Sequence, residues 1–432
     1  MTPMHSLVQP IPRTCPISRI GNGAGHHFFG YYDKTNWGAG NRILLGHRVA
    51  ARDFELAPDS VAEIGYFDLA GSGEFHVCGR TTAWNWQMGS QLQWLDAARS
   101  ERLIYNIRTD GSTGLYPGFG SVIFDRASGC SRQLDTPIYV AAPNGRYALT
   151  VDYERLYVTH KTIGYAGLAG RRADLQPCPG DDGIHRLDLE TGETRLLVSY
   201  ADLKALDHRP SMAKAIHWVS HIEINPSSNR ILFLHRWTER VEDETCFLHR
   251  LITMDPDGGS IRLLECSDHP LPQLQDDFDP TAVGTFDYEK SEYQISHPLW
   301  RDDDHIIVWG PHAGAIHYHL YEDAEPALVS IVGKGVLTEN GHMTYSPVDQ
   351  RWLLTDTYPD PVSNERILIL YDVANDIRYD IGTLYADPKL TKENRCDLHP
   401  RWSQDGRTVC IDSMHEHERQ IYAIDVSSIV GA

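Results

Sequence analysis

The sequence predicts an all-β fold, a single seven-bladed β-propeller. Three observations support this prediction. The first is that seven segments in which two apolar runs flank a turn recur along the 432 residues, and the second is that an alternating strand that closes on an acidic residue follows each segment. A third is that helical periodicity is almost absent, the main exception being residues 200–213. Seven near-equal β units avoid exposed edges by closing into a ring, whereas a β-sandwich would not explain the repeat.

Each predicted blade combines one opening segment with one closing strand. The openings are residues 36–45, 93–105, 141–150, 223–233, 300–309, 344–354 and 401–410. The closing strands end near Asp68, Asp125, Asp188, Asp255, Glu322, Asp372 and Asp425. Most openings carry a turn such as Asn144-Gly145 or Asp405-Gly406, which is typical of hairpins.

The whole chain, residues 1–432, is expected to form one domain. A strand near residues 17–22 is expected to complete the last blade and close the ring, and residues 1–16 are expected to be irregular. Long connections near residues 48–61, 159–180, 273–294 and 358–366 are expected to gather at one rim, where loops shape binding sites.

Composition and charge narrow the class of protein. A formal net charge of −20 disfavours a nucleic-acid partner, and no apolar run is long enough to span a bilayer. The eight cysteines are scattered without a Cys-x-x-Cys pair, which disfavours a zinc ribbon or a thioredoxin-type site. Residues 1–13 lack the apolar stretch of a secretion signal, so we expect a cytoplasmic protein, a monomer or a small homo-oligomer.

Histidines recur at one place in the repeated units. They are His26 and His27 in the first unit, and His221, His297, His342 and His399 before short apolar runs in later units. A residue at one phase of a repeat lies at one depth of the fold, so blades around an axis would bring these imidazoles together. Convergent imidazoles are typical of metal binding and proton transfer.

The second half of the chain resembles a known family. The resemblance rests on the motifs Ser220-His221, Ser296-His297-Pro298-Leu299-Trp300, Gly341-His342 and Asn394-Arg395-Cys396-Asp397-Leu398-His399-Pro400. Their order is similar to the blade openings of the oligogalacturonate lyases and related propeller-fold polysaccharide lyases. Residues 401–426 also resemble the blade repeat of TolB-type propellers, which bears on the fold alone. The resemblance implies a lyase that acts on a uronic-acid-containing oligosaccharide.

The resemblance also implies a divalent metal near the axis. The histidine of the family's Thr-His-x-x-Trp opening falls on His297, and its Gln-x-x-His-x-His motif falls on Asn394, Asp397 and His399. Both replacements keep an oxygen ligand, so the set favours Mn²⁺, with Ca²⁺ or Zn²⁺ as alternatives. The family's catalytic arginine falls on Gly183. A uronic acid other than galacturonate, as in ulvan, glucuronan or rhamnosyl-glucuronate, is therefore an alternative substrate.

Elimination at a uronic acid requires neutralisation of the carboxylate, a base for the C5 proton and an acid for the leaving oxygen. The catalytic candidates are His221, His27, His26 and Tyr32 for proton transfer, and Arg236, which could bind the substrate carboxylate through two hydrogen bonds. Alternation places His26 and His27 on opposite faces of one strand, and either could face the channel. The candidates for substrate binding are Trp86, Gln87, Tyr31, His342 and Arg186.

Two other classes of protein fit part of the pattern. A non-catalytic TolB-like propeller, serving as a binding or scaffold module, would have axial histidines without a metal. A hydrolase of the prolyl-oligopeptidase type needs a Gly-x-Ser-x-Gly motif on a separate α/β domain, and the sequence has neither.

Overall fold

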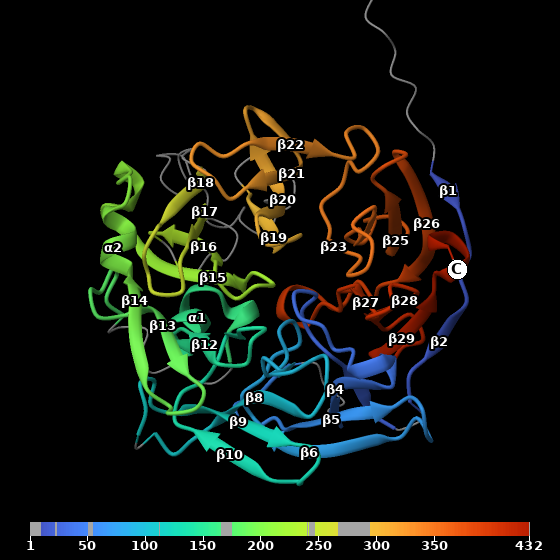
Figure 1. Ribbon diagram of the computed structural model, residues 1–432, viewed down its shortest axis with the longest axis horizontal. Coiled ribbons are helices and arrows are strands. Elements are labelled where there is room, and N and C mark those ends of the chain that lie inside the picture. Colours follow the sequence, from blue (N-terminus) through green and yellow to red (C-terminus); the bar gives the residue numbers. More distant parts are fainter. Residues whose placement is uncertain are drawn as a thin grey trace, which may run out of the picture.

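The computed structural model is a ring of seven β-sheets around a central axis (Figure 1). It describes residues 10–21, 24–50, 55–111, 113–165, 175–239, 241, 247–266 and 294–431. Six sheets have four strands and one has five, and helices are few and short. The fold is a seven-bladed β-propeller, which confirms the prediction from the repeats.

Consecutive antiparallel strands build the blades. The first three blades are β3–β6 (His26–Phe28, Ile43–Val49, Ala62–Asp68, Phe75–Thr81), β7–β10 (Gln93–Trp94, Arg102–Arg108, Phe119–Asp125, Ser131–Leu134) and β11–β14 (Val140–Ala141, Tyr147–Thr150, Gly183–Asp188, Thr194–Ser199). The next three are β15–β18 (Ile216–Ile224, Ile231–Thr238, Leu248–Met254, Arg262–Cys266), β19–β22 (Ser296–Trp300, His305–His312, Ala315–Glu322, Val329–Val332) and β23–β26 (Thr344–Tyr345, Trp352–Asp356, Glu365–Asp372, Ile377–Tyr385). The seventh contains β27–β29 (Arg401–Trp402, Thr408–Ser413, Gln420–Asp425).

The N-terminal segment closes the ring. Strand β2 (Ile17–Arg19) pairs antiparallel with β29 and becomes the outer strand of the seventh blade, as predicted. Figure 1 shows this blue strand beside the red C-terminal ones. The segment 1–16 was expected to be irregular, but it contains a short strand, β1 (Ile11–Pro12), which pairs parallel with β26. Residues 1–9 lie outside the described part of the chain.

Short helices occupy the connections. The expected helical stretch at 200–213 contains α2 (Tyr200–Ala205), whose Ser199 and Asp202 form a capping box, and the 3₁₀ turn η4 (Pro210–Met212). Further 3₁₀ turns are η1 (Ala39–Asn41), η2 (Lys161–Ile163) and η8 (Lys392–Asn394), and the short helix α3 (Ser427–Val430) is near the C-terminus. Among the described residues, no helix has both the length and the apolar character that a membrane crossing requires.

Helix α1 (Tyr153–Thr159) was not predicted from the sequence. Its residues include tyrosine, valine and threonine, which are common in strands, and seven residues give too few turns for a clear helical period. Asp152 caps it, because the Asp152 side chain accepts a hydrogen bond from the backbone N–H of Glu154 at 2.8 Å.

Apolar side chains fill the space between neighbouring blades. Ile104 of β8, Ala148 of β12 and Leu187 of β13, for example, belong to one buried cluster that joins two blades. Burial of apolar surface contributes about 25 cal/mol per Å². Each blade is thus fixed between its two neighbours, and the inner strands hold their side chains at a constant depth around the axis. Parts of the predicted long connections, including residues 273–293, lie outside the described residues.

Candidate metal centre and proton-transfer pair

A local distortion of the backbone orients three of the recurring histidines. His221, His297 and His399 have positive φ angles of 52°, 54° and 43°. The strand register shifts between Ser220 and Glu223 and between Ser296 and Leu299. A residue in the left-handed conformation at a bulge turns its side chain out of the strand's alternation, and such strained positions are common at functional sites.

These histidines come together around two tyrosines. The ring centroids of His297 and His342 are 4.2 Å apart, and those of His342 and His399 are 4.5 Å apart. Tyr31 lies 4.9 Å from the His399 ring, and Tyr32 lies 5.3 Å from the His342 ring. We call these side chains, together with His221 and Asp397, the axial group. All of its members are at least nine-tenths buried.

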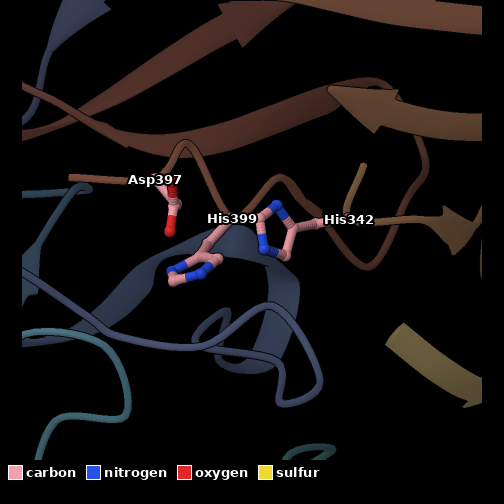
Figure 2. A group of neighbouring side chains, drawn as sticks. All are labelled: His342, Asp397 and His399. Atoms are coloured by element: carbon pink, nitrogen blue, oxygen red, sulfur yellow. The ribbon is translucent and has the colours of Figure 1, made fainter. Parts of the chain in front are cut away.

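Three members of the axial group have the arrangement of metal ligands. The side chains of His342, Asp397 and His399 each offer a ligand atom, and these atoms lie within 4.8 Å of one another (Figure 2). The Nδ1 atom of His342 is 3.0 Å from Asp356 Oδ1, which leaves Nε2 to face a metal. The buried Nε2 of His399 has no hydrogen-bond partner among the described residues. Two imidazoles and one carboxylate suit Mn²⁺ or Zn²⁺, so these residues fit a divalent cation.

The predicted ligands only partly coincide with this group. The predicted ligands Asp397 and His399 belong to the group of three. The third member is His342, which was expected to bind substrate, whereas the predicted ligands His297 and Asn394 are outside the group. His297 is its neighbour and is oriented like His342, with Nδ1 3.0 Å from Asn340 Oδ1 and Nε2 3.4 Å from the Tyr358 hydroxyl. Asn394 is in η8, where its backbone oxygen accepts a hydrogen bond from Arg419. The shared phase of the repeat is the signal that would have added His342.

Two arginines hold the Asp397 carboxylate. Arg366 Nη1 is 2.6 Å and Arg395 Nε is 2.8 Å from Asp397 Oδ1. The positive charges of Arg395 and Arg366 outweigh the effect of burial and hold the pKa of Asp397 well below its usual value. Asp397 is therefore ionised and would offer a negatively charged oxygen to a cation. Neither arginine was predicted, although Arg395 lies inside the motif that carries the resemblance.

A tyrosine and a histidine form a hydrogen-bonded pair in the axial group. The Tyr31 hydroxyl and His221 Nε2 are 2.9 Å apart, and His221 Nδ1 is 3.0 Å from Ser220 Oγ. Burial, followed by the nearby Arg236 charge, lowers the pKa of His221 well below 6.5. Burial likewise raises the pKa of Tyr31 well above 10. The resting pair is thus a neutral imidazole hydrogen-bonded to a neutral phenol.

The other predicted residues near the axis have different surroundings. The Tyr32 hydroxyl is buried and has no partner among the described residues. Arg236 is buried, with Nη1 2.9 Å from His160 Nδ1 and its guanidinium 4.7 Å above the Phe247 ring. Arg236 is on β16 opposite Trp218 of β15, the strand that also carries His221, and its charge adds to the lowering of the His221 pKa.

Beside this pair is a buried ionic group that was not predicted. Lys34 Nζ is 2.6 Å from Asp33 Oδ2, and the buried Glu223 carboxyl is close enough to Asp33 and Lys34 to interact with both charges. Burial and the neighbouring Asp33 charge raise the pKa of Glu223 well above its usual value. Asp33 follows Tyr31 by two residues, and Glu223 follows His221 by two, so this contact ties together the segments that carry the pair.

Some predicted residues are not brought to the axial group. His27 is packed between Phe67 and Phe75, and its Nδ1 is 3.0 Å from Gln420 Oε1. His26 contacts the Trp86 ring at 5.9 Å and accepts a hydrogen bond from the Arg419 backbone N–H.

Three predicted substrate-binding residues also have structural contacts. Trp86 is buried beneath the Arg419 guanidinium, 4.6 Å from its ring centroid. Gln87 donates a hydrogen bond to the Arg395 backbone oxygen at 2.6 Å. The Arg186 guanidinium lies 4.2 Å above the Tyr147 ring, on β13 of the third blade. In each case the side chain is already held by contacts with other residues of the protein.

Taken together, these observations define a seven-bladed propeller with a buried metal-type group and a Tyr–His pair on its axis. The chain is similar to two solved oligogalacturonate lyases. The one from Vibrio parahaemolyticus has a TM-score of 0.62 and 12% identity, and the similarity covers 95% of this chain and 94% of that chain. The other, an oligogalacturonate lyase in complex with manganese, has a TM-score of 0.60 and 14% identity, covering 97% of both chains. At this identity the similarity shows the shared fold. No protein-family model and no curated protein matches the sequence.

Proposed function

We propose that this protein is a lyase that cleaves a uronic-acid-containing oligosaccharide by metal-assisted β-elimination. One observation carries the proposal: the metal-type group and the proton-transfer pair meet at Tyr31. The Tyr31 ring lies 4.9 Å from that of His399, and its hydroxyl lies 2.9 Å from His221 Nε2. The solved structure of an oligogalacturonate lyase in complex with manganese supports the choice of Mn²⁺.

The metal held by His342, Asp397 and His399 would supply positive charge at the substrate carboxylate, which acidifies the C5 proton. Tyr31 then takes that proton on its oxygen while its own proton passes to His221 Nε2. The electron pair of the C5–H bond forms the C4–C5 double bond, and the C4–O bond breaks. The proton on His221 returns through Tyr31 to the leaving oxygen, so the pair ends as it began.

The choice of uronic acid depends on a further feature of the site, the position of the charge-stabilising arginine. A Cβ at Gly183 would lie 2.1 Å from the Val198 backbone oxygen, so strand packing leaves no room for an arginine at that position. We assign its charge-stabilising role to Arg236, which is buried near His221. An altered position for this charge favours a uronic acid other than galacturonate.

The test is a search for an unsaturated uronate product. Metal-free protein is supplied with Mn²⁺ and a panel of galacturonate, glucuronate and rhamnosyl-glucuronate oligomers, and the ultraviolet absorbance of the product is followed. We expect a rise with at least one oligomer that is abolished by a chelator and by His221→Ala. No absorbance change with any oligomer under these conditions would refute the proposal.

One observation favours the alternative, a non-catalytic propeller. The side chains of the axial group are all at least nine-tenths buried, as expected for an axis filled for stability alone. Such a protein would bind no metal at His342, Asp397 and His399. Elemental analysis of the purified protein separates the two functions, because a stoichiometric divalent metal that is lost in Asp397→Asn is incompatible with an inert axis.

A further inference from the structure

A cavity lies beside the candidate metal centre, between the sixth and seventh blades. Its volume is about 200 Å³. Three cationic side chains line it, Arg366, Lys392 and Arg395, against a single acidic residue, Asp387. In a chain with a net charge of −20, this is a local reversal of sign. Guanidinium and ammonium groups around a small cavity are typical of sites for carboxylates and phosphates.

The two arginines of the cavity wall are the same two that hold Asp397. Arg366 and Arg395 are within 2.8 Å of Asp397 Oδ1, so the cavity is one side chain away from the metal-type group. The Arg395 guanidinium also lies 4.6 Å above the Tyr358 ring, and the Tyr358 hydroxyl is 3.4 Å from His297 Nε2. The cavity and the axial group are therefore separated by a single layer of side chains.

One hydrogen-bond donor of the Arg366 guanidinium is unused among the described residues. The Arg366 side chain is 2% exposed, and its buried Nε has no partner among the described residues. A buried guanidinium nitrogen without an acceptor costs free energy, and a shift of the Arg366 side chain toward an anion in the adjoining cavity would relieve that cost.

We infer that this cavity is a subsite for a second carboxylate of the substrate, that of a uronic acid beyond the one being cleaved. The identity of the ligand as a uronate rests on the proposed function, whereas the preference for an anion rests on the cavity itself. A chain of linked uronic acids carries a carboxylate on each such sugar. A bound chain that runs past the layer formed by Arg366, Arg395 and Tyr358 would place one carboxylate at the axial group while another neutralises the cations of the cavity.

The subsite and the metal are coupled through Asp397. Without a metal, the Asp397 charge is directed at Arg366 and Arg395. A divalent cation on Asp397 offsets that charge and leaves the arginines more attractive to an anion. Binding of the metal and of the anion is therefore mutually favourable, and the coupling must be equal in both directions.

Lys392 is the residue to change, since it lines the cavity, is exposed and is absent from the catalytic group. Isothermal titration calorimetry would follow a saturated uronate dimer and a neutral hexose dimer binding to the full chain, with and without Mn²⁺. For Lys392→Gln we expect about fivefold weaker binding of the uronate dimer, equivalent to about 1 kcal/mol. Lys389→Gln is the matched control, an exposed lysine nearby that does not line the cavity. It should bind the dimer like wild type, and Mn²⁺ should tighten binding.

The outcomes separate this inference from the proposed function. Equal affinity of wild type and Lys392→Gln for the uronate dimer would overturn the subsite, even with lyase activity present. Sulfate binding that depends on Lys392 but does not compete with the dimer would also overturn it, in favour of a site for a small inorganic anion. Dimer binding that depends on Lys392, without unsaturated product from any oligomer, would support the anion cavity and refute the lyase.

Discussion

Tyr31 connects the two halves of the axial group. It follows Gly30, which has a φ of 122° and passes so close to Met88 that a Cβ would lie 2.9 Å from the Met88 backbone carbon. Only glycine meets both requirements without strain. This close passage of the backbone presents the Tyr31 ring to His399 and its hydroxyl to His221.

Replacing Tyr31 by phenylalanine removes the hydroxyl and keeps the ring. We expect kcat to fall by about 10²–10⁴-fold, the range for loss of a proton-transfer group, with metal content unchanged. Tyr32→Phe is the matched control, because the Tyr32 hydroxyl has no partner among the described residues. Initial rates with the best uronate oligomer measure both variants. A similar loss in both would contradict the role of the Tyr31 hydroxyl.

Glu223 is expected to affect stability in a pH-dependent way. Burial and the Asp33 charge raise the pKa of Glu223 well above 4.5, so the folded state holds this proton more tightly than the unfolded state. Stability contributed by the protonated group is present at low pH and is lost as pH rises through the folded pKa. Glu223→Gln carries no titrating group, so we expect it to exceed wild type in stability at pH 8 by about 1–3 kcal/mol. Urea unfolding at pH 8 and pH 5 measures the difference, which should shrink at pH 5. A difference that does not change with pH would contradict this assignment.

The phase of the histidines in the sequence was sufficient to predict their convergence, but not their roles. Whether an imidazole can bind a metal depends on the partner of its other nitrogen, which is Asp356 for His342 and Asn340 for His297. These partners are 14 and 43 residues away along the chain, with no motif to connect them. His26 and His27 share the phase of the others, yet β3 turns them toward Trp86 and Gln420.

At the scale of elements, the strands were predictable and the distortions were not. Hairpin turns and alternation indicated the blades, including the N-terminal strand expected near residues 17–22 and found at Ile17–Arg19, which closes the ring. The left-handed residues that aim His221, His297 and His399 at the axis leave no trace in composition, because the bulge residue is a histidine rather than a glycine. Helix α1 was missed for a related reason, since its β-prone residues favour a strand locally.

Strand β2 is expected to contribute to the stability of the ring. It pairs with β29, and the neighbouring Cys15 and Ile20 are buried. Deleting residues 1–21 removes this pairing and burial, and we expect a loss of about 2–5 kcal/mol in unfolding free energy. Deleting residues 1–9 alone is the control, because β1 and β2 begin at Ile11 and Ile17. Thermal unfolding compares the three chains, and equal midpoints would show that β2 does not close the ring.

At the scale of the whole molecule, buried histidines are expected to lower the stability of the protein in acid. Burial lowers the pKa of His27 and of His217 to about 4, and that of His47 to about 3, from 6.5. Because the folded pKa values are depressed, the unfolded state binds more protons below pH 6.5, and stability falls as pH drops toward 4. Each histidine contributes up to about 3 kcal/mol of this loss.

This prediction is checked by urea unfolding at pH 7.5 and pH 5. We expect a lower free energy of unfolding at pH 5, and a smaller difference between the two pH values in His47→Gln. His208→Gln, which changes an exposed histidine, should behave like wild type. Unfolding free energies that are equal at the two pH values would contradict the assignment of neutral buried imidazoles.

We propose above all that the axial group holds a divalent metal required for β-elimination. The most direct measurement is the rate of unsaturated uronate formation while Mn²⁺ is titrated into metal-free protein, with bound metal counted in the same samples. We predict a rate that rises in proportion to bound metal up to a single ion per chain, and no rise in His342→Ala. A rate independent of bound metal, or no product at full occupancy, would contradict the claim.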